Sequence, residues 1–217
     1  MNGSLLSITS NTTDNSIASK ETEVNSSYES QTTKETDLKN HIIKSISLSL
    51  NDIIKENQKT NSKFVTKDLF YLSFIPPISL EDYIKLLMKY TKMDISTLIN
   101  SIIYIDYFCD KNKYYITPHN IYRILLSACL LSLKFNEDIT INYKIYAEIA
   151  AVSVEDLRKL EFYMYLKLHF TLNVKYELYK SYYDYFANYK IPKNEKNKWK
   201  KLLIDLIINY ILYYYFY

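Results

Sequence analysis

The two residues of this chain best suited to chemistry or recognition are a lysine, Lys134, and a glutamate, Glu161. They stand in two successive long helix-forming segments. Lys134 stands near the end of a long apolar segment. An ammonium and a carboxylate can pair with each other and still hydrogen-bond exposed backbone groups of a second molecule. Taken alone, the two residues are better explained by an internal salt bridge that links two helices, with no partner involved.

The apolar segment that carries Lys134 spans residues 120–138 and is apolar on nearly every side. A helix without a polar stripe must be enclosed by other helices. Thr117 before Pro118 is a helix start signal, because Thr can cap free amides and Pro is pre-set for the first turn. The sequence therefore predicts a central, buried helix over 117–135.

Helix patterns account for most of the remaining chain as well. Ser79 with Asp82, and Ser153 with Asp156, have the spacing of capping boxes. No segment alternates apolar and polar residues with the period of a strand. The other helices are expected over 38–60, 79–92, 94–109, 142–150 and 153–167, so the predicted fold class is all-α.

Composition excludes several kinds of site. Glycine occurs once, at Gly3, so a phosphate-cradling glycine loop cannot be built. The three histidines are far apart, and Cys109 and Cys129 lack metal-ligand spacing, which favours reduced thiols in the nucleus or cytoplasm. No nucleophile–base pair stands out either. We therefore expect no catalytic residue, no metal and no cofactor in this chain.

The two ends differ in composition from the middle. In residues 1–37, 19 are Ser, Thr or Asn, which predicts a polar tail without fixed structure. Residues 191–217 form an expected amphipathic helix in which Lys201, Asp205 and Asn209 make a polar stripe. Its uninterrupted part, 202–217, is shorter than the ~20 apolar residues of a membrane span. Packing against the domain, partner binding and membrane-surface association all stay open for this helix, although a membrane role is the least expected.

The order and spacing of several short motifs resemble a cyclin box. The motifs are Tyr104-Ile-Asp106, Asn120-Ile-Tyr-Arg123, Leu133-Lys-Phe135, Asn142, Tyr146-Ala147 and Leu160-Glu161. The similarity is greatest to the short P- or U-type cyclins, the phosphate-regulon-like branch, and covers about residues 74–186. It implies one cyclin box of about five core helices with flanking amino- and carboxy-terminal helices. The expected segments are a tail over 1–37, a helix over 38–60, the box over 61–190 and a helix over 191–217.

The resemblance implies a regulatory subunit that binds and activates a cyclin-dependent protein kinase, in cell-cycle or nutrient control. Lys134 and Glu161 would form the centre of that contact. An apolar socket around them would consist of Leu131, Phe135, Tyr165, Phe170 and Leu172. Asn142 and Tyr146 match interface positions of the short branch, but a helix cap and a core aromatic explain them equally well. Asp106 and Arg123 are expected to be structural.

Two departures from the family pattern bear on this expectation. In the family, an arginine pairs with the aspartate that corresponds to Asp106. This chain has Leu86 in place of that arginine, so Asp106 is expected to bond to Lys85, Lys89 or solvent. Ala150-Ala151 replaces a frequent Gly-Gly and is expected to extend its helix. Two alternatives to the kinase subunit are a cyclin-fold adaptor in transcription and a membrane-associated helical scaffold. Nucleic-acid binding is not expected, because the lysines are spread out.

Overall fold

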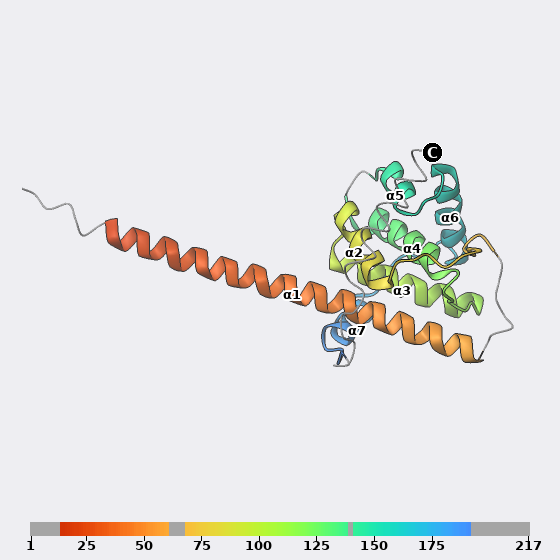
Figure 1. Ribbon diagram of the computed structural model, residues 1–217, viewed down its shortest axis with the longest axis horizontal. Coiled ribbons are helices and arrows are strands. Elements are labelled where there is room, and N and C mark those ends of the chain that lie inside the picture. The colour runs from red at the N-terminus through yellow and green to blue at the C-terminus, as the bar shows by residue number, and fades with distance from the viewer. Residues whose placement is uncertain (1–13, 61–67, 139–140, 192–217) are drawn as a thin grey trace, which may run out of the picture. The chain divides into compact units, whose positions relative to one another are not determined.

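The computed structural model describes residues 14–60, 68–138 and 141–191, which form seven helices and no strand (Figure 1). The predicted all-α class is confirmed. After the long helix α1 (Asp14–Thr60) come α2 (Leu80–Thr91), α3 (Ile95–Asn112), α4 (Ile121–Asn136), α5 (Tyr143–Ile149), α6 (Val154–Lys167) and α7 (Tyr176–Ala187). None of the described helices is long and apolar enough to cross a membrane. The helix predicted over 191–217 falls outside the described residues, except for Ile191.

Helix α1 begins at Asp14, much earlier than the sequence predicted. Residues 14–37, expected to lack fixed structure, are helical, and 32–40 are exposed. The segment 14–60 contains neither Gly nor Pro, and Ser, Thr and Asn each cost only a few tenths of a kcal/mol in a helix. From His41 onwards the helix belongs to the second compact unit of the chain, where Ile43, Ile46 and Leu50 are buried in its core. The domain boundary proposed at residue 37 stays a prediction.

Helix α4 is the buried centre of this unit, as its sequence predicted. Twelve of its residues are buried, and it packs mainly against α3 and α6. Its small residues permit close approach and also bond to α3. Ser132 donates to the backbone oxygen of Thr97 at 2.7 Å, and the thiol of Cys129 lies 3.5 Å from the Ser101 hydroxyl. The end of α4, where Lys134 stands, is thereby fixed relative to its neighbours.

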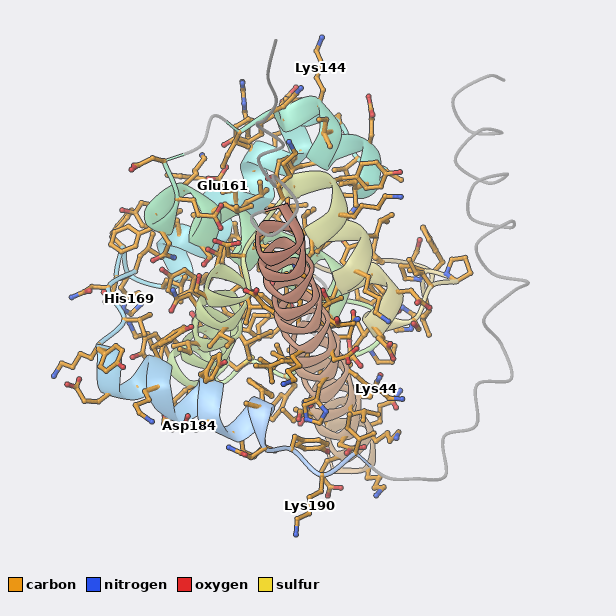
Figure 2. The ribbon with its side chains drawn as sticks, turned by 90° about the vertical axis from the view of Figure 1, so that its left-hand side faces the viewer. Lys44, Lys144, Glu161, His169, Asp184 and Lys190 are labelled. Atoms are coloured by element: carbon orange, nitrogen blue, oxygen red, sulfur yellow. The ribbon has the colours of Figure 1, made fainter. Side chains whose placement is uncertain are left out.

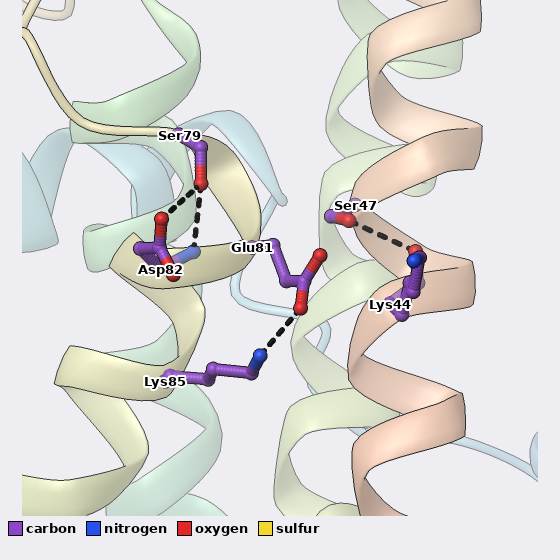
Figure 3. A network of polar contacts seen from close by, with 6 residues as sticks. All are labelled: Lys44, Ser47, Ser79, Glu81, Asp82 and Lys85. Carbon is purple, nitrogen blue, oxygen red and sulfur yellow. Dashed lines mark hydrogen bonds and ion pairs between the residues drawn. The ribbon is translucent and has the colours of Figure 1, made fainter. Parts of the chain in front are cut away.

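The predicted serine caps are present at the starts of α2 and α6, although the Asp side chains bond to the serine hydroxyls and not to the serine amides. The hydroxyl of Ser79 accepts a hydrogen bond from the Asp82 amide at 3.1 Å (Figure 3), and Ser153 accepts one from Asp156 at 3.0 Å. The predicted start of the central helix is wrong. Thr117 and Pro118 form a turn in which the Thr117 amide donates to the Asn120 side chain at 2.7 Å, so α4 begins only at Ile121.

Several helices of the described chain end at a left-handed residue that is not glycine. After α3, α5 and α6 a non-glycine residue takes the left-handed conformation that glycine usually supplies: Lys113, Ala151 and His169. In α5, the amides of Ala151 and Val152 bond to the oxygens of Glu148 and Ala147, which is the Schellman pattern. The expectation that Ala150-Ala151 extends its helix is wrong, because Ala150 caps α5 and Ala151 has φ of 49°.

We expect the substitution Ala151→Gly to stabilise the protein by about 0.5–1 kcal/mol. A left-handed alanine is strained by its Cβ, and the relief exceeds the added entropy of the unfolded chain. Ala151 is exposed, so no packing is lost. The matched control is Ala150→Gly, because Ala150 has φ of −88° and gains nothing. Urea denaturation measures both, and equal losses of stability in the two variants would contradict the prediction.

Candidate functional site

Lys134 and Glu161 form an ion pair between the last turn of α4 and the middle of α6. The two side chains are buried to different degrees: Glu161 is 9% exposed and Lys134 is 42% exposed. Figure 2 shows Glu161 among neighbouring side chains, whereas Lys144 on α5 points away from the domain. The carboxylate is therefore the enclosed member of the pair, and the ammonium is the member that a second molecule can reach.

A third residue, Tyr143, completes the polar centre. Its hydroxyl donates to Oε2 of Glu161 at 2.5 Å. Its ring lies 5.0 Å from the Lys134 Nζ and 5.2 Å from the Arg158 guanidinium, both within the range of cation–π attraction. Tyr143 is the first residue of α5, so three helices meet at this point. Sequence reasoning missed it, because nothing local indicates that α5 closes over the pair.

The surroundings keep the two donors of this centre protonated. Burial lowers the pKa of Lys134, but the hydrogen bonds to Glu161 and Tyr143 outweigh it and leave that pKa above its usual value. Burial, followed by the hydrogen bond to Glu161, raises the pKa of Tyr143. At neutral pH the centre therefore consists of an ammonium and a neutral phenol facing the Glu161 side chain. Such a centre holds hydrogen-bonding groups in place between three helices.

The polar centre lies in a pocket of about 450 Å³ between the ends of α4 and α6. Six residues of the predicted site line it: Leu131, Lys134, Phe135, Glu161, Tyr165 and Leu172. Tyr143, Arg158 and Phe162 complete the lining. Phe135 and Phe162 are 54% and 59% exposed, so the pocket presents large aromatic surface beside a charged pair.

Phe170, predicted as part of the apolar socket, does not line this pocket but packs against Tyr165, which does, and the end of α6 explains why. Its ring packs edge-on against Tyr165 at 4.8 Å, the contact that accompanies a Schellman motif. Its amide bonds to the Tyr165 oxygen at 3.1 Å, and its φ of 59° turns the chain. Leu172 follows, with its carbonyl held by the Tyr104 hydroxyl at 2.7 Å. The turn thus leaves Phe170 57% exposed.

Asn142 and Tyr146 serve as a helix cap and a core aromatic, the second of the two explanations offered by the sequence. The Asn142 side chain caps α5 by accepting from the Lys144 amide at 3.1 Å, and Tyr146 is only 3% exposed. Burial raises the pKa of Tyr146 to about 12, as expected for a core phenol. Neither side chain lines the pocket around Lys134. In this structure Asn142 positions α5, and with it Tyr143, while Tyr146 fills the core.

Asp106 and Arg123 lie away from the pocket and bond to other parts of the fold. Asp106 accepts from the Tyr182 hydroxyl of α7 at 2.6 Å. Lys85, one of its expected partners, pairs with Glu81 on its own helix (Figure 3). Arg123 donates to the backbone oxygens of Leu69 and Tyr71 at 2.9 and 3.3 Å, and so ties the segment before α2 to α4.

Metal-binding clusters and thiols are the remaining candidates for chemistry among the described side chains. Among the residues that the structure describes, no group of three or more His, Cys, Asp or Glu side chains could hold a metal ion. The thiols of Cys109 and Cys129 are free, and burial raises the pKa of each to about 12. What the pocket provides is a fixed ion pair, a phenol and exposed aromatic rings.

Comparison with known proteins places this arrangement in a family. The sequence model of the cyclin family matches residues 1–172. Cyclin-U4-3 of Arabidopsis thaliana is 30% identical over 134 residues, which cover 61% of this chain and 58% of the relative. Cyclin-U2-1 of the same plant is 28% identical over 109 residues, covering 50% and 49%, and Cyclin-P3-1 of Oryza sativa subsp. japonica is 24% identical over 131 residues, covering 60% and 54%. The chain spans about half the length of these relatives. With its all-α architecture and this match over most of its length, the chain belongs to the cyclin family, as a cyclin of the P/U type.

Proposed function

We propose that this cyclin is the regulatory subunit of a cyclin-dependent protein kinase, in the nucleus or cytoplasm, and that it performs no chemistry itself. One observation carries the proposal: an ion pair with an enclosed carboxylate and an accessible ammonium, Lys134–Glu161, lines a pocket together with exposed aromatic rings. Interfaces between proteins are commonly centred on such a cluster of aromatic anchors around a desolvated polar contact.

The geometry suits the recognition of a helix and the backbone beside it. Lys134 has three N–H donors, and its pairing with Glu161 leaves donors free for the carbonyls of a partner. Phe135, Phe162 and Phe170 supply apolar surface for side chains of the partner. Both sets belong to the helices α4 and α6 and to the ordered turn after α6, so little order has to be gained on binding.

The rigidity of the cyclin surface accounts for how binding would activate the kinase. A protein kinase transfers phosphate only when a glutamate of its C-helix pairs with the lysine that positions ATP. A partner that binds this arrangement better than the inactive one shifts the population of the kinase toward it. The box offers a fixed surface for that purpose, because α4 is enclosed on nearly all sides. ATP and magnesium belong to the kinase and not to this chain.

We expect Phe135→Glu to abolish co-purification of a kinase from the cells that make this protein. The substitution places a charge in the apolar rim, and Phe135 is 54% exposed, so the fold tolerates it. The matched control is Tyr90→Glu on α2, at 52% exposure. Mass spectrometry identifies the bound proteins, and phosphate transfer to a Ser/Thr-Pro peptide measures activity. Recovery of the same kinase with both variants would show that this pocket is not the contact, and recovery of no kinase with the unmodified chain would refute the proposed function.

A further inference from the structure

A second, larger cavity lies on other helices of the same unit. It measures about 700 Å³ and runs between α1, α3 and α7. Much of its lining is apolar and includes Leu50, Ile53, Ile102, Ile105, Tyr185 and Phe186. Ile53 is 48% exposed and Tyr185 is 56% exposed. The kinase contact proposed above uses none of these residues, so the groove is a separate apolar surface.

Two further features of the groove favour an apolar occupant that also carries polar groups. The Ser49 hydroxyl lines it, and its oxygen is buried without a hydrogen-bond partner among the described residues. Such an unmet group destabilises the fold until something pairs with it. Asp106 and Asp110 also line the groove, one turn apart on α3. Lys113 partly offsets them, through a highly exposed ion pair with Asp110.

The chain itself continues with a segment of matching chemistry. Residues 193–201 contain five lysines and one glutamate, and 202–217 are apolar apart from Asp205 and Asn209. Lysines next to an apolar segment complement acidic side chains next to an apolar groove. We propose that the groove between α1, α3 and α7 is the docking site of the chain's own segment 202–217.

The lengths of the connecting residues and of the segment 202–217 are consistent with docking in this groove. The described chain ends at Ile191, five residues after Phe186 of the groove. Residues 192–201 can extend up to ~33 Å, which is ample to return to the groove. As a helix, 202–217 would measure ~24 Å, against ~17 Å for the lining stretch of α1 from Ile46 to Asn57. The face opposite the polar stripe would carry Leu203, Ile207, Tyr210 and Tyr214.

Tethering favours this occupant over a second molecule. A ten-residue connection gives an effective local concentration in the millimolar range. A second copy of the chain or a separate protein would have to exceed that concentration or bind more tightly. Docking would also provide a hydroxyl, from Tyr210 or Tyr214, within the same groove as the Ser49 oxygen.

Cys109 is a natural reporter, because it lines the groove while Cys129 is only 1% exposed. In the full chain at pH 9, we expect Ile207→Glu to speed alkylation of Cys109 at least tenfold, by removing the segment from the groove. Ile208→Glu is the matched control, since residue 208 would lie beside the polar stripe, and its rate should stay within about twofold of the unmodified chain. Thermal unfolding confirms that all three proteins are folded at the assay temperature.

A disulfide trap tests the same contact without a charge. In the full chain carrying Tyr210→Cys, mild oxidation should link Cys109 to position 210 within one molecule. Equal alkylation rates in the two glutamate variants, together with no intramolecular link, would overturn the proposal. A link that forms only between molecules and rises with protein concentration would also overturn it, and would assign the groove to a second copy.

Discussion

Replacing Lys134 by alanine is expected to weaken binding of the partner kinase by roughly 10²-fold or more. The substitution leaves the Glu161 carboxylate, which is 9% exposed, with the Tyr143 hydroxyl as its remaining partner in the centre. Binding would then cover an unpaired charge, and removing one member of such a pair at an interface costs about 2–5 kcal/mol. Each ~1.4 kcal/mol is a factor of ten in affinity. Isothermal titration of the purified variant into the kinase measures the loss.

The matched control for this prediction is Lys159→Ala on α6. Lys159 also forms ion pairs, with Glu155 at 2.8 Å and Asp156 at 3.5 Å, and its side chain is 54% exposed. Exposed pairs of this kind contribute little, so we expect a change in affinity below about fivefold. If the two alanine variants bind the kinase equally well while both remain folded, the Lys134–Glu161 pair is a structural link only.

The parts of this fold that could be predicted from sequence are those fixed by neighbouring residues. The serine caps at Ser79 and Ser153 correctly placed the starts of α2 and α6, because a cap involves residues three apart. The burial of α4 followed from its apolar composition on every side. The ion pair was expected from the charge of Lys134 near the end of that helix and the nearest suitable carboxylate, and the structure joins the two.

What could not be predicted depends on contacts between distant segments. Tyr143 joins the polar centre only because α5 packs against α6. The partner of Asp106 is Tyr182, on a helix that was not predicted at all. The spacing of Tyr179, Tyr182, Tyr183 and Phe186 on one face could have indicated α7, but the abundance of tyrosine in this chain concealed the pattern.

Backbone conformation at the helix ends was misjudged for a different reason. Sequence rules assign left-handed residues to glycine, and this chain has one glycine, at Gly3. Ala151 and His169 take that conformation because Schellman hydrogen bonds and side-chain packing hold the turn. Thr117 does not act as a cap, because its buried hydroxyl has no hydrogen-bond partner among the described residues, whereas its amide bonds to the Asn120 side chain.

We expect Phe70→Ala to lower the free energy of unfolding by about 3–5 kcal/mol. Phe70 is completely buried, in a segment that precedes α2 and lies outside the motifs of the cyclin box. Its ring contacts Phe108 of α3 edge-on at 5.5 Å and Tyr163 of α6 at 5.3 Å. Alanine removes those contacts and leaves a cavity that helices fixed on α4 cannot close. Urea denaturation of the full chain measures the change.

Leu69→Ala is the neighbouring control, because Leu69 is 46% exposed and its loss should cost less than about 1 kcal/mol. The comparison isolates the role of Phe70 as the residue by which this segment joins the core. Asp68 supports the same attachment, since it accepts from the Tyr114 and Tyr163 hydroxyls at 2.9 and 3.3 Å. Similar small losses in both variants would mean that the segment is held by these polar contacts and by Arg123. A large loss in Phe70→Ala alone would mean that the folded unit requires an aromatic anchor outside the motifs of the cyclin box.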